Sequence, residues 1–180
     1  KQFILIFSMY QGAMFVEVKN DPPHSESDLK YEQSDLDTRT GILSDFYSQH
    51  HFTKNRRNQS VSEERRSQKF KEWMGKDKKV LDLGCRDGIL PRHFIDQNEV
   101  TGMDIDKMAL EDCKKNLNIE TKWADFSLQI PLPTSSFDVI VAGETLEHLP
   151  YPAITLSEIS RILIPDGLFI GSVPNSYHLK

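Results

Sequence analysis

Acidic residues and glycines come together where one short apolar run ends. The chain passes from a pattern typical of a strand buried on both faces into a turn with two glycines over Val80-Leu81-Asp82-Leu83-Gly84-Cys85-Arg86-Asp87-Gly88. Glycine lets a ligand approach the backbone, and the start of a following helix offers N–H groups to an anionic ligand. We expect that helix to begin near Leu90. The stretch therefore predicts a site for a nucleotide-like ligand.

The spacing of the glycines distinguishes between two kinds of nucleotide site. A dinucleotide fingerprint requires G-x-G-x-x-G with an acid about 20 residues further on. Here Gly84 and Gly88 lie four residues apart, and an acid, Asp82, precedes the first of them. This pattern resembles motif I, acid-x-Gly-x-Gly-x-Gly, of the class I S-adenosylmethionine-dependent methyltransferases. The resemblance implies a Rossmann-like fold, S-adenosylmethionine as the cofactor and methyl transfer as the activity.

Arg86 stands where motif I has its middle glycine. Arginine lacks the freedom of glycine at positive φ. Either the turn keeps an ordinary backbone angle at this position, or cofactor binding is weakened. The guanidinium would be able to pair with the methionyl carboxylate of the cofactor, and otherwise it points to solvent. The sequence leaves these alternatives open.

Strand and helix patterns alternate at short intervals after residue 78. We expect strands at 99–104, 120–124, 137–142 and 168–173, and helices at 107–117 and 152–163. Such alternation predicts an α/β fold: an open, mainly parallel twisted sheet with helices on both faces. Since the chain stops at Lys180, we expect it to lack the usual C-terminal antiparallel strands and to leave an exposed sheet edge.

The remaining cofactor residues are implied by the resemblance and follow the next strands. Asp104 would accept both ribose hydroxyls, while Asp106 fits the N-cap of the next helix better. Asp125 would meet the adenine amino group, and the backbone N–H of Phe126 a ring nitrogen. The complete predicted set is Asp82, Gly84, Cys85, Arg86, Gly88, Asp104, Ile105, Ala124, Asp125, Phe126 and Gly143.

Chemistry at the acceptor is assigned to residues that follow the fourth strand. Holding the acceptor against the methyl group supplies much of the rate, and a base is needed when the acceptor is a hydroxyl. We expect His148 to be that base, with Glu144 beside it; the alternative is a histidine that fixes the loop. The stretch also resembles the Glu-x-x-Glu-His element of ubiquinone-type O-methyltransferases. There Glu144, Glu147 and His148 would hold a divalent cation, although we expect no metal.

The chain divides into three expected regions. Residues 1–40 are predicted to be an N-terminal arm and a polar linker, residues 41–77 a helical cap, and residues 78–180 the cofactor-binding core. Phe3 to Phe7 is too short to span a bilayer and would be an edge strand, a docked arm or an engineered remnant. Because the chain opens with Lys1, we expect a fragment or a processed product. Ser60 to Glu63 predicts a capping box for a helix that ends at Gly75.

Composition limits the choice of partners. Lys and Arg total 22 against 27 Asp and Glu, for a net charge of −5, which does not favour a nucleic-acid partner. Only the basic stretch from Lys54 to Lys79 supports the alternative of an RNA or nucleic-acid methyltransferase. Cys85 and Cys113 show no metal-binding spacing, which indicates reduced thiols in a cytoplasmic protein. We expect a small-molecule acceptor and no membrane; a catalytically silent domain is the other alternative.

Overall fold

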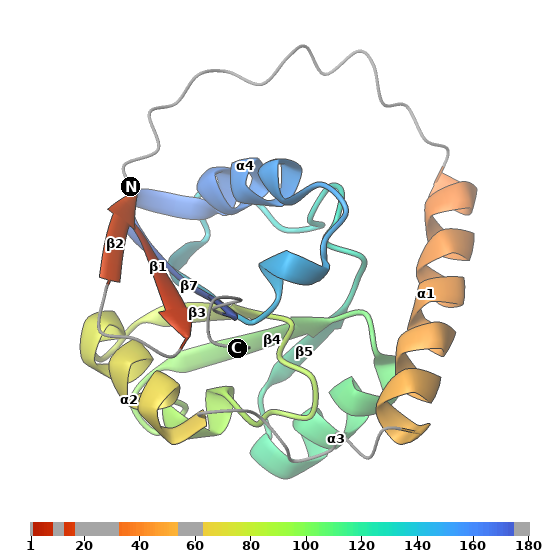
Figure 1. The fold of residues 1–180 in the computed structure, drawn as a ribbon, viewed down its shortest axis with the longest axis horizontal. Helices are drawn as coiled ribbons and strands as arrows, with labels where there is room; N and C mark the ends of the chain where they lie inside the picture. The colour runs from red at the N-terminus through yellow and green to blue at the C-terminus, as the bar shows by residue number, and fades with distance from the viewer. Residues whose placement is uncertain (1, 9–12, 17–32, 54–62, 175–180) are drawn as a thin grey trace, which may run out of the picture.

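The computed structural model describes residues 2–8, 13–16, 33–53 and 63–174, which form one twisted sheet with helices on both faces (Figure 1). The strands are β1 (Gln2–Ser8), β2 (Ala13–Val16), β3 (Lys79–Leu83), β4 (Glu99–Asp104), β5 (Glu120–Trp123), β6 (Phe137–Gly143) and β7 (Leu163–Pro174). The helices are α1 (Gln33–Thr53), α2 (Glu63–Met74), α3 (Lys107–Leu117) and α4 (Pro152–Ile162), with 3₁₀ turns η1 (Pro91–His93) and η2 (Leu146–His148).

The strand order β2-β1-β7-β6-β3-β4-β5 confirms the predicted Rossmann-like sheet. Every neighbouring pair is parallel except β1 and β2. From β3 the chain moves outward through β4 to β5, then returns to the other side of β3 with β6. Strand order therefore reverses beside β3, and ligands of open α/β sheets bind beyond the carboxyl ends of the strands at such a point.

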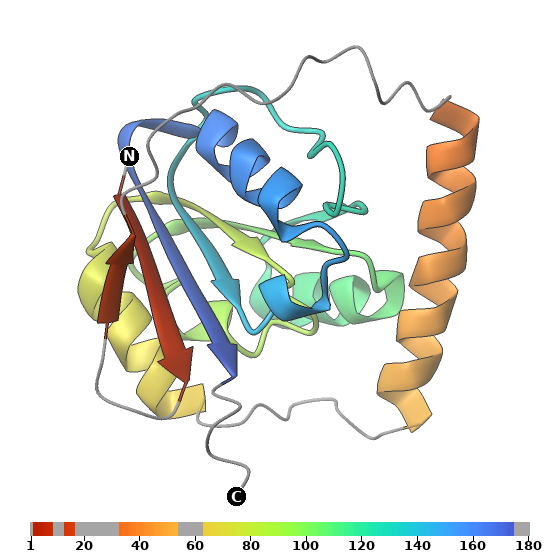
Figure 2. The ribbon, with the colours of Figure 1, turned by 45° about the horizontal axis from the view of Figure 1, so that its top comes forward.

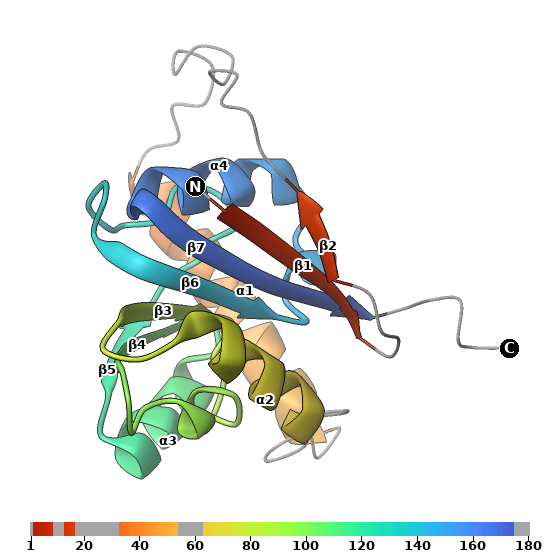
Figure 3. The ribbon, with the colours of Figure 1, turned by 90° about the vertical axis from the view of Figure 1, so that its left-hand side faces the viewer.

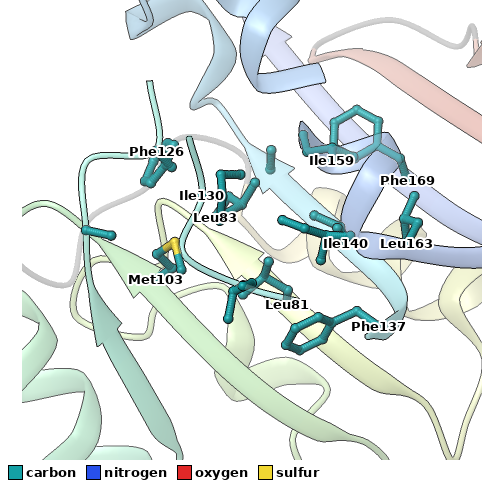
Figure 4. Close-up of a cluster of buried hydrophobic side chains, with 14 of the residues drawn as sticks. Leu81, Leu83, Met103, Phe126, Ile130, Phe137, Ile140, Ile159, Leu163 and Phe169 are labelled. Atoms are coloured by element: carbon teal, nitrogen blue, oxygen red, sulfur yellow. The ribbon is translucent and has the colours of Figure 1, made fainter. Parts of the chain in front are cut away.

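Both faces of β3 are buried, as its apolar run predicts. Leu81 packs with Ile140, Ile159 and Phe169 in the cluster beneath α4 (Figure 4). Val80 faces the opposite cluster, which includes α2 side chains. Figure 3 shows α4 on one side of the sheet and α2 and α3 on the other. Each fully buried large apolar side chain contributes about 1.5–3 kcal/mol, so these two layers fix the position of the strand ends.

The expectation of a helix after the glycine turn is wrong. The chain forms one 3₁₀ turn, η1, and then further turns before β4 begins at Glu99. Pro91 opens η1, and the few residues left before Glu99 are too short a segment for a regular helix packed along the sheet. No helix N-terminus therefore faces the ligand at this loop.

The N-terminal residues correct two expectations. Strand β1 lies parallel to β7 from Gln2 opposite Leu168 to Ser8 opposite Pro174, and β2 pairs antiparallel with β1. The edge of β7 that we expected to be exposed is therefore covered by an N-terminal hairpin. Helix α1 begins at Gln33, so the end of the predicted linker is helical; the linker residues 17–32 and the capping-box residues Ser60 to Ser62 lie outside the described part.

The last strand begins earlier than the sequence predicts. Strand β7 starts at Leu163, and its pairing with β6 jumps from Leu163 opposite Phe137 to Leu168 opposite Val139. This register shift is a bulge inside the strand, with Asp166 at φ +62°. Among the described helices, none combines the length and apolarity that a bilayer crossing needs.

Deletion of residues 1–16 should expose the edge of β7. Since β1 pairs with β7 over its full length, we expect the deletion to lower the free energy of unfolding by several kcal/mol and to promote self-association. Urea unfolding and light scattering after size-exclusion chromatography measure the two effects. An unchanged unfolding midpoint and a monomeric profile would show that the hairpin does not contribute to the sheet.

Candidate functional site

A cavity of about 1220 Å³ is lined by residues at the carboxyl ends of the parallel strands and by residues of α1. Figure 2 shows α1 beside the sheet. The cavity exceeds the usual volume of a single small-molecule pocket, so it has room for two ligands side by side. The predicted residues that line it are Gly84, Cys85, Arg86, Asp104, Ile105, Asp125, Phe126, Gly143, Glu144 and His148. Asp82, Gly88 and Ala124 were predicted as well but are not among the lining residues.

The glycine loop is anchored to the neighbouring strands. The backbone N–H groups of Gly84 and Cys85 donate to the carbonyl of Met103, at 2.8 and 3.2 Å. Gly84 has φ +80°, and a Cβ at this position would collide with the side chain of Thr145. The Thr145 hydroxyl in turn donates to the Leu83 carbonyl at 3.0 Å. Gly84 is therefore required both by its backbone angle and by the close approach of the β6 loop.

Glycine is required at position 88 because α3 packs closely against the loop there. Gly88 has φ +89°, and a Cβ here would lie 2.6 Å from Cδ1 of Leu117 and 3.1 Å from Sγ of Cys113. Both neighbours belong to α3. Gly88 thus lets α3 pack against the loop, which explains why a residue of the motif lies away from the cavity.

Arg86 adopts the left-handed conformation that its position in the motif demands, with φ +48°. Its backbone N–H donates to Oδ2 of Asp104 at 2.8 Å, and its side chain lines the cavity. An ordinary backbone angle, one of the alternatives that the sequence left open, is therefore excluded. An L-residue in this region carries about 1–2 kcal/mol of strain, which the surrounding contacts must offset.

Asp104 is at the centre of the cleft and is 4% exposed. Its Oδ2 accepts from Arg86, and its Oδ1 accepts from the backbone N–H of Asp106 at 2.8 Å. Asp106 caps α3 as predicted, because its side chain accepts from the N–H of Ala109 at 3.1 Å. The Asp104 carboxylate therefore links the glycine loop to the start of α3 at the wall of the cavity.

Asp82 lies directly beneath the loop and is completely buried. Within the described part of the chain neither carboxylate oxygen has a hydrogen-bond partner. Burial, together with the nearby Asp104 carboxylate, raises the pKa of Asp82 to about 8, and Arg66 opposes this shift. Such a carboxyl group destabilises the fold at neutral pH, and residues of this kind concentrate at functional sites.

Two arginines of the cleft were missed by sequence reasoning. Arg66 of α2 is 7% exposed and pairs with Glu144, with 2.7 Å between Nη1 and Oε1. Arg39 of α1 lies 3.4 Å from Asp125 through Nε and Oδ2. Arg66 belongs to the basic stretch from Lys54 to Lys79, and Arg39 to the region predicted as arm and linker. Leu43, Phe46, Tyr47 and His50 of α1 also line the cavity.

The predicted catalytic residues lie at the far end of the cavity from Asp125. Glu144 has φ +55°, and Arg66 engages its carboxylate. The His148 side chain is 60% exposed, with its Nε2 3.9 Å from Oε1 of Glu147. Burial raises the pKa of Glu147. Among the described residues no three His, Cys, Asp or Glu side chains converge as a metal site would require.

The core of the chain is similar in sequence to known proteins. A family profile described as a methyltransferase domain matches residues 81–171. The ubiquinone biosynthesis O-methyltransferase of Nitrosococcus oceani is 33% identical over 104 residues, which are 54% of this chain and 44% of that protein. The enzyme of the same name from Actinobacillus pleuropneumoniae is 36% identical over 108 residues, 54% of this chain and 46% of that protein. The chain thus spans less than half the length of these two relatives.

A solved structure extends the comparison to the fold. Coclaurine N-methyltransferase, solved with N-methylheliamine and S-adenosylhomocysteine, has a TM-score of 0.52 and 25% identity over 62% of this chain and 38% of that protein. This similarity supports the same α/β type of fold for this chain.

Asp82→Asn should stabilise the protein, and more strongly at higher pH. Below about pH 3 the carboxyl is mainly neutral in both the folded and the unfolded chain; between about pH 4 and 8 the unfolded chain has lost the proton and the folded chain keeps it, so stability falls as pH rises. Asparagine removes this decline, and we expect a gain of roughly 2–5 kcal/mol at pH 8 and less at pH 5. Urea unfolding at both pH values measures it, with the exposed Asp96→Asn as the control. Equal gains at both pH values would contradict the assignment.

Arg86→Gly should also stabilise the fold, by about 1 kcal/mol, because it relieves the left-handed angle. Ser135→Gly is the matched control, since Ser135 has φ +52° in an exposed turn away from the cavity. Thermal unfolding of both variants separates backbone relief from loss of the arginine side chain. A destabilised Arg86→Gly beside a stabilised Ser135→Gly would show that the guanidinium contributes more than the strain removes.

Proposed function

The chain belongs to the class I S-adenosylmethionine-dependent methyltransferases, and on this basis we propose that it transfers a methyl group to the oxygen of a small-molecule acceptor. The family assignment confirms the cofactor expected from the sequence. The observation that carries the proposal is the cavity itself. It joins the glycine loop, the buried Asp104 carboxylate and the residues after β6, with volume left for an acceptor.

The residues present fit S-adenosylmethionine. Asp104, a nearly buried carboxylate in the cavity wall, would hold the ribose hydroxyls, and Asp125 with the Phe126 N–H would hold the adenine. Gly84, Cys85 and Gly143 line the same cavity. Asp82, Gly88 and Ala124 act indirectly, by supporting the loop and the strand ends. When bound, the cofactor supplies an electrophilic methyl group on a sulfonium.

The arginines of the cleft are proposed to take the methionyl carboxylate. Arg66 and Arg86 both line the cavity beside the glycine loop, and a guanidinium pairs well with a carboxylate. Arg66 already fixes the carboxylate of Glu144. Glu144 would therefore shape the acceptor side with its charge compensated, rather than act as a free base.

His148 is the proposed base. Its side chain is 60% exposed, and the residue lines the cavity. As the acceptor oxygen bonds to the methyl carbon and the bond from that carbon to the sulfonium sulfur breaks, the acceptor hydroxyl would pass its proton to His148, and the electron pair would stay on the sulfur of S-adenosylhomocysteine.

Oxygen as the acceptor atom is supported by the ubiquinone biosynthesis O-methyltransferases among the relatives.

The nucleic-acid alternative rested on the basic stretch, and two described residues of that stretch are engaged within the protein. Arg66 faces the cavity, and Lys69 pairs with Glu72 at 2.8 Å.

The buried thiols of Cys85 and Cys113, which form no disulfide, support the expectation of a cytoplasmic protein.

The proposal is tested first by binding. Calorimetry should show that S-adenosylhomocysteine binds the wild-type chain and that Asp104→Asn weakens binding by about 1.5–3 kcal/mol, the scale of hydrogen bonds to a charged group. Asp96→Asn, at an exposed site, should leave affinity unchanged. A folded wild-type chain that binds no cofactor would favour the silent-domain alternative. A folded Asp104→Asn with full affinity would remove Asp104 from the ribose site.

His148→Gln should lower the rate of methyl transfer to a phenolic acceptor about 100-fold or more, because general-base catalysis contributes on this scale. Methyl transfer from radiolabelled cofactor measures the rate and thermal unfolding measures stability, with His93→Gln as the control in η1. A lower melting temperature with an unchanged rate would instead indicate a loop-fixing histidine.

A further inference from the structure

Helix α1 is held over the cavity by polar contacts from three positions along its length. The Ser44 hydroxyl accepts from the indole Nε1 of Trp123 at 3.3 Å, and the Ser48 hydroxyl donates to Asp106. Arg39 reaches the residues after β5 in the same way. In Figures 1 and 2, α1 stands beside α3 and the ends of β4 and β5. The helix is thus fixed above the strand ends to which the ribose and the adenine are assigned.

Arg39 makes two contacts at the adenine end of the cavity. Its Nε lies 3.4 Å from Oδ2 of Asp125, and one of its terminal nitrogens donates to Oγ of Ser127 at 3.1 Å. Asp125 itself is fixed from the other side, because its Oδ1 accepts from the backbone N–H of Ser127 at 2.9 Å. All three residues line the cavity, as Phe126 does. The guanidinium is therefore held in one place at the wall of the site.

The donors and acceptors of this pair are not used up by these contacts. A carboxylate offers about four lone-pair sites, so Asp125 can accept an amino group while it keeps Arg39 and Ser127. A guanidinium has five N–H donors and a planar face, of which the two contacts use Nε and one terminal nitrogen. An acceptor beside a donor matches adenine, whose amino group lies next to a ring nitrogen.

We infer that the Arg39 guanidinium, held by Asp125, contacts the adenine base of the cofactor and so makes α1 part of base recognition. This inference rests on the proposed function. The competing arrangement has Arg39 covering Asp125 and leaving when the base arrives. The two arrangements predict opposite effects of removing the arginine, since a contact that is lost weakens binding and a competitor that is lost strengthens it.

The test compares two ligands that differ by the base. S-adenosylhomocysteine carries adenine, and S-ribosylhomocysteine lacks it; calorimetry and NMR titration give both dissociation constants. For Arg39→Ala we expect S-adenosylhomocysteine to bind about 5- to 30-fold more weakly and S-ribosylhomocysteine to bind within about twofold of wild type. Arg39→Lys keeps the charge but loses the planar guanidinium. Its affinity for S-adenosylhomocysteine should therefore lie between those of Arg39→Ala and wild type.

Ser48→Ala is the matched control, because Ser48 anchors the same helix at Asp106 without reaching the base. It should change the affinities for both ligands by the same factor. Tighter binding of S-adenosylhomocysteine by Arg39→Ala would establish competition and overturn the inference. If Arg39→Ala weakens the binding of both ligands by the same factor, as expected for Ser48→Ala, then Arg39 acts only as an anchor of α1. That result would overturn the inference as well. Failure of wild type to bind S-adenosylhomocysteine would instead refute the proposed function.

Discussion

The carboxylate of Asp104 holds three parts of the cleft together. One oxygen accepts from the backbone of Arg86 in the glycine loop, and the other accepts from Asp106 at the start of α3. Both bonds are charge-assisted and nearly closed to water, where an unpaired partner would be costly. Loop, β4 and α3 are therefore fixed relative to one another before a ligand arrives. Because the proposed ribose contact uses the same group, one buried charge serves both the fold and the binding site.

The sequence predicted the parts of the site that depend on local patterns. The alternation of strands and helices gave the parallel core, and glycines with acids at strand ends located Gly84, Asp104 and Asp125 around one cavity. The capping role of Asp106 was also correct. These features follow from residue type and spacing, because the ends of parallel strands must meet at one edge of the sheet.

What the sequence did not predict depends on contacts between distant segments. Arg39 and Arg66 belong to the cleft through their pairing with Asp125 and Glu144, and no local pattern distinguishes them from solvated arginines. The helix expected after the glycine turn is missing because the segment before β4 is too short, although its apolar residues suit a helix. Gly88 matches the motif, yet the crowding of α3 against it is visible only in three dimensions.

The pairing of β1 with β7 has a consequence for how the protein is made. Phe3 lies opposite Phe169, so the chain between them must be synthesised before this pair forms. Closing so long a loop for a parallel pairing is entropically slow, and β1 with β2 alone would be a two-stranded hairpin of marginal stability. During translation β1 would therefore remain without β7, its main pairing strand. Its exposed backbone would be protected from aggregation only by chaperones or by rapid completion of the chain.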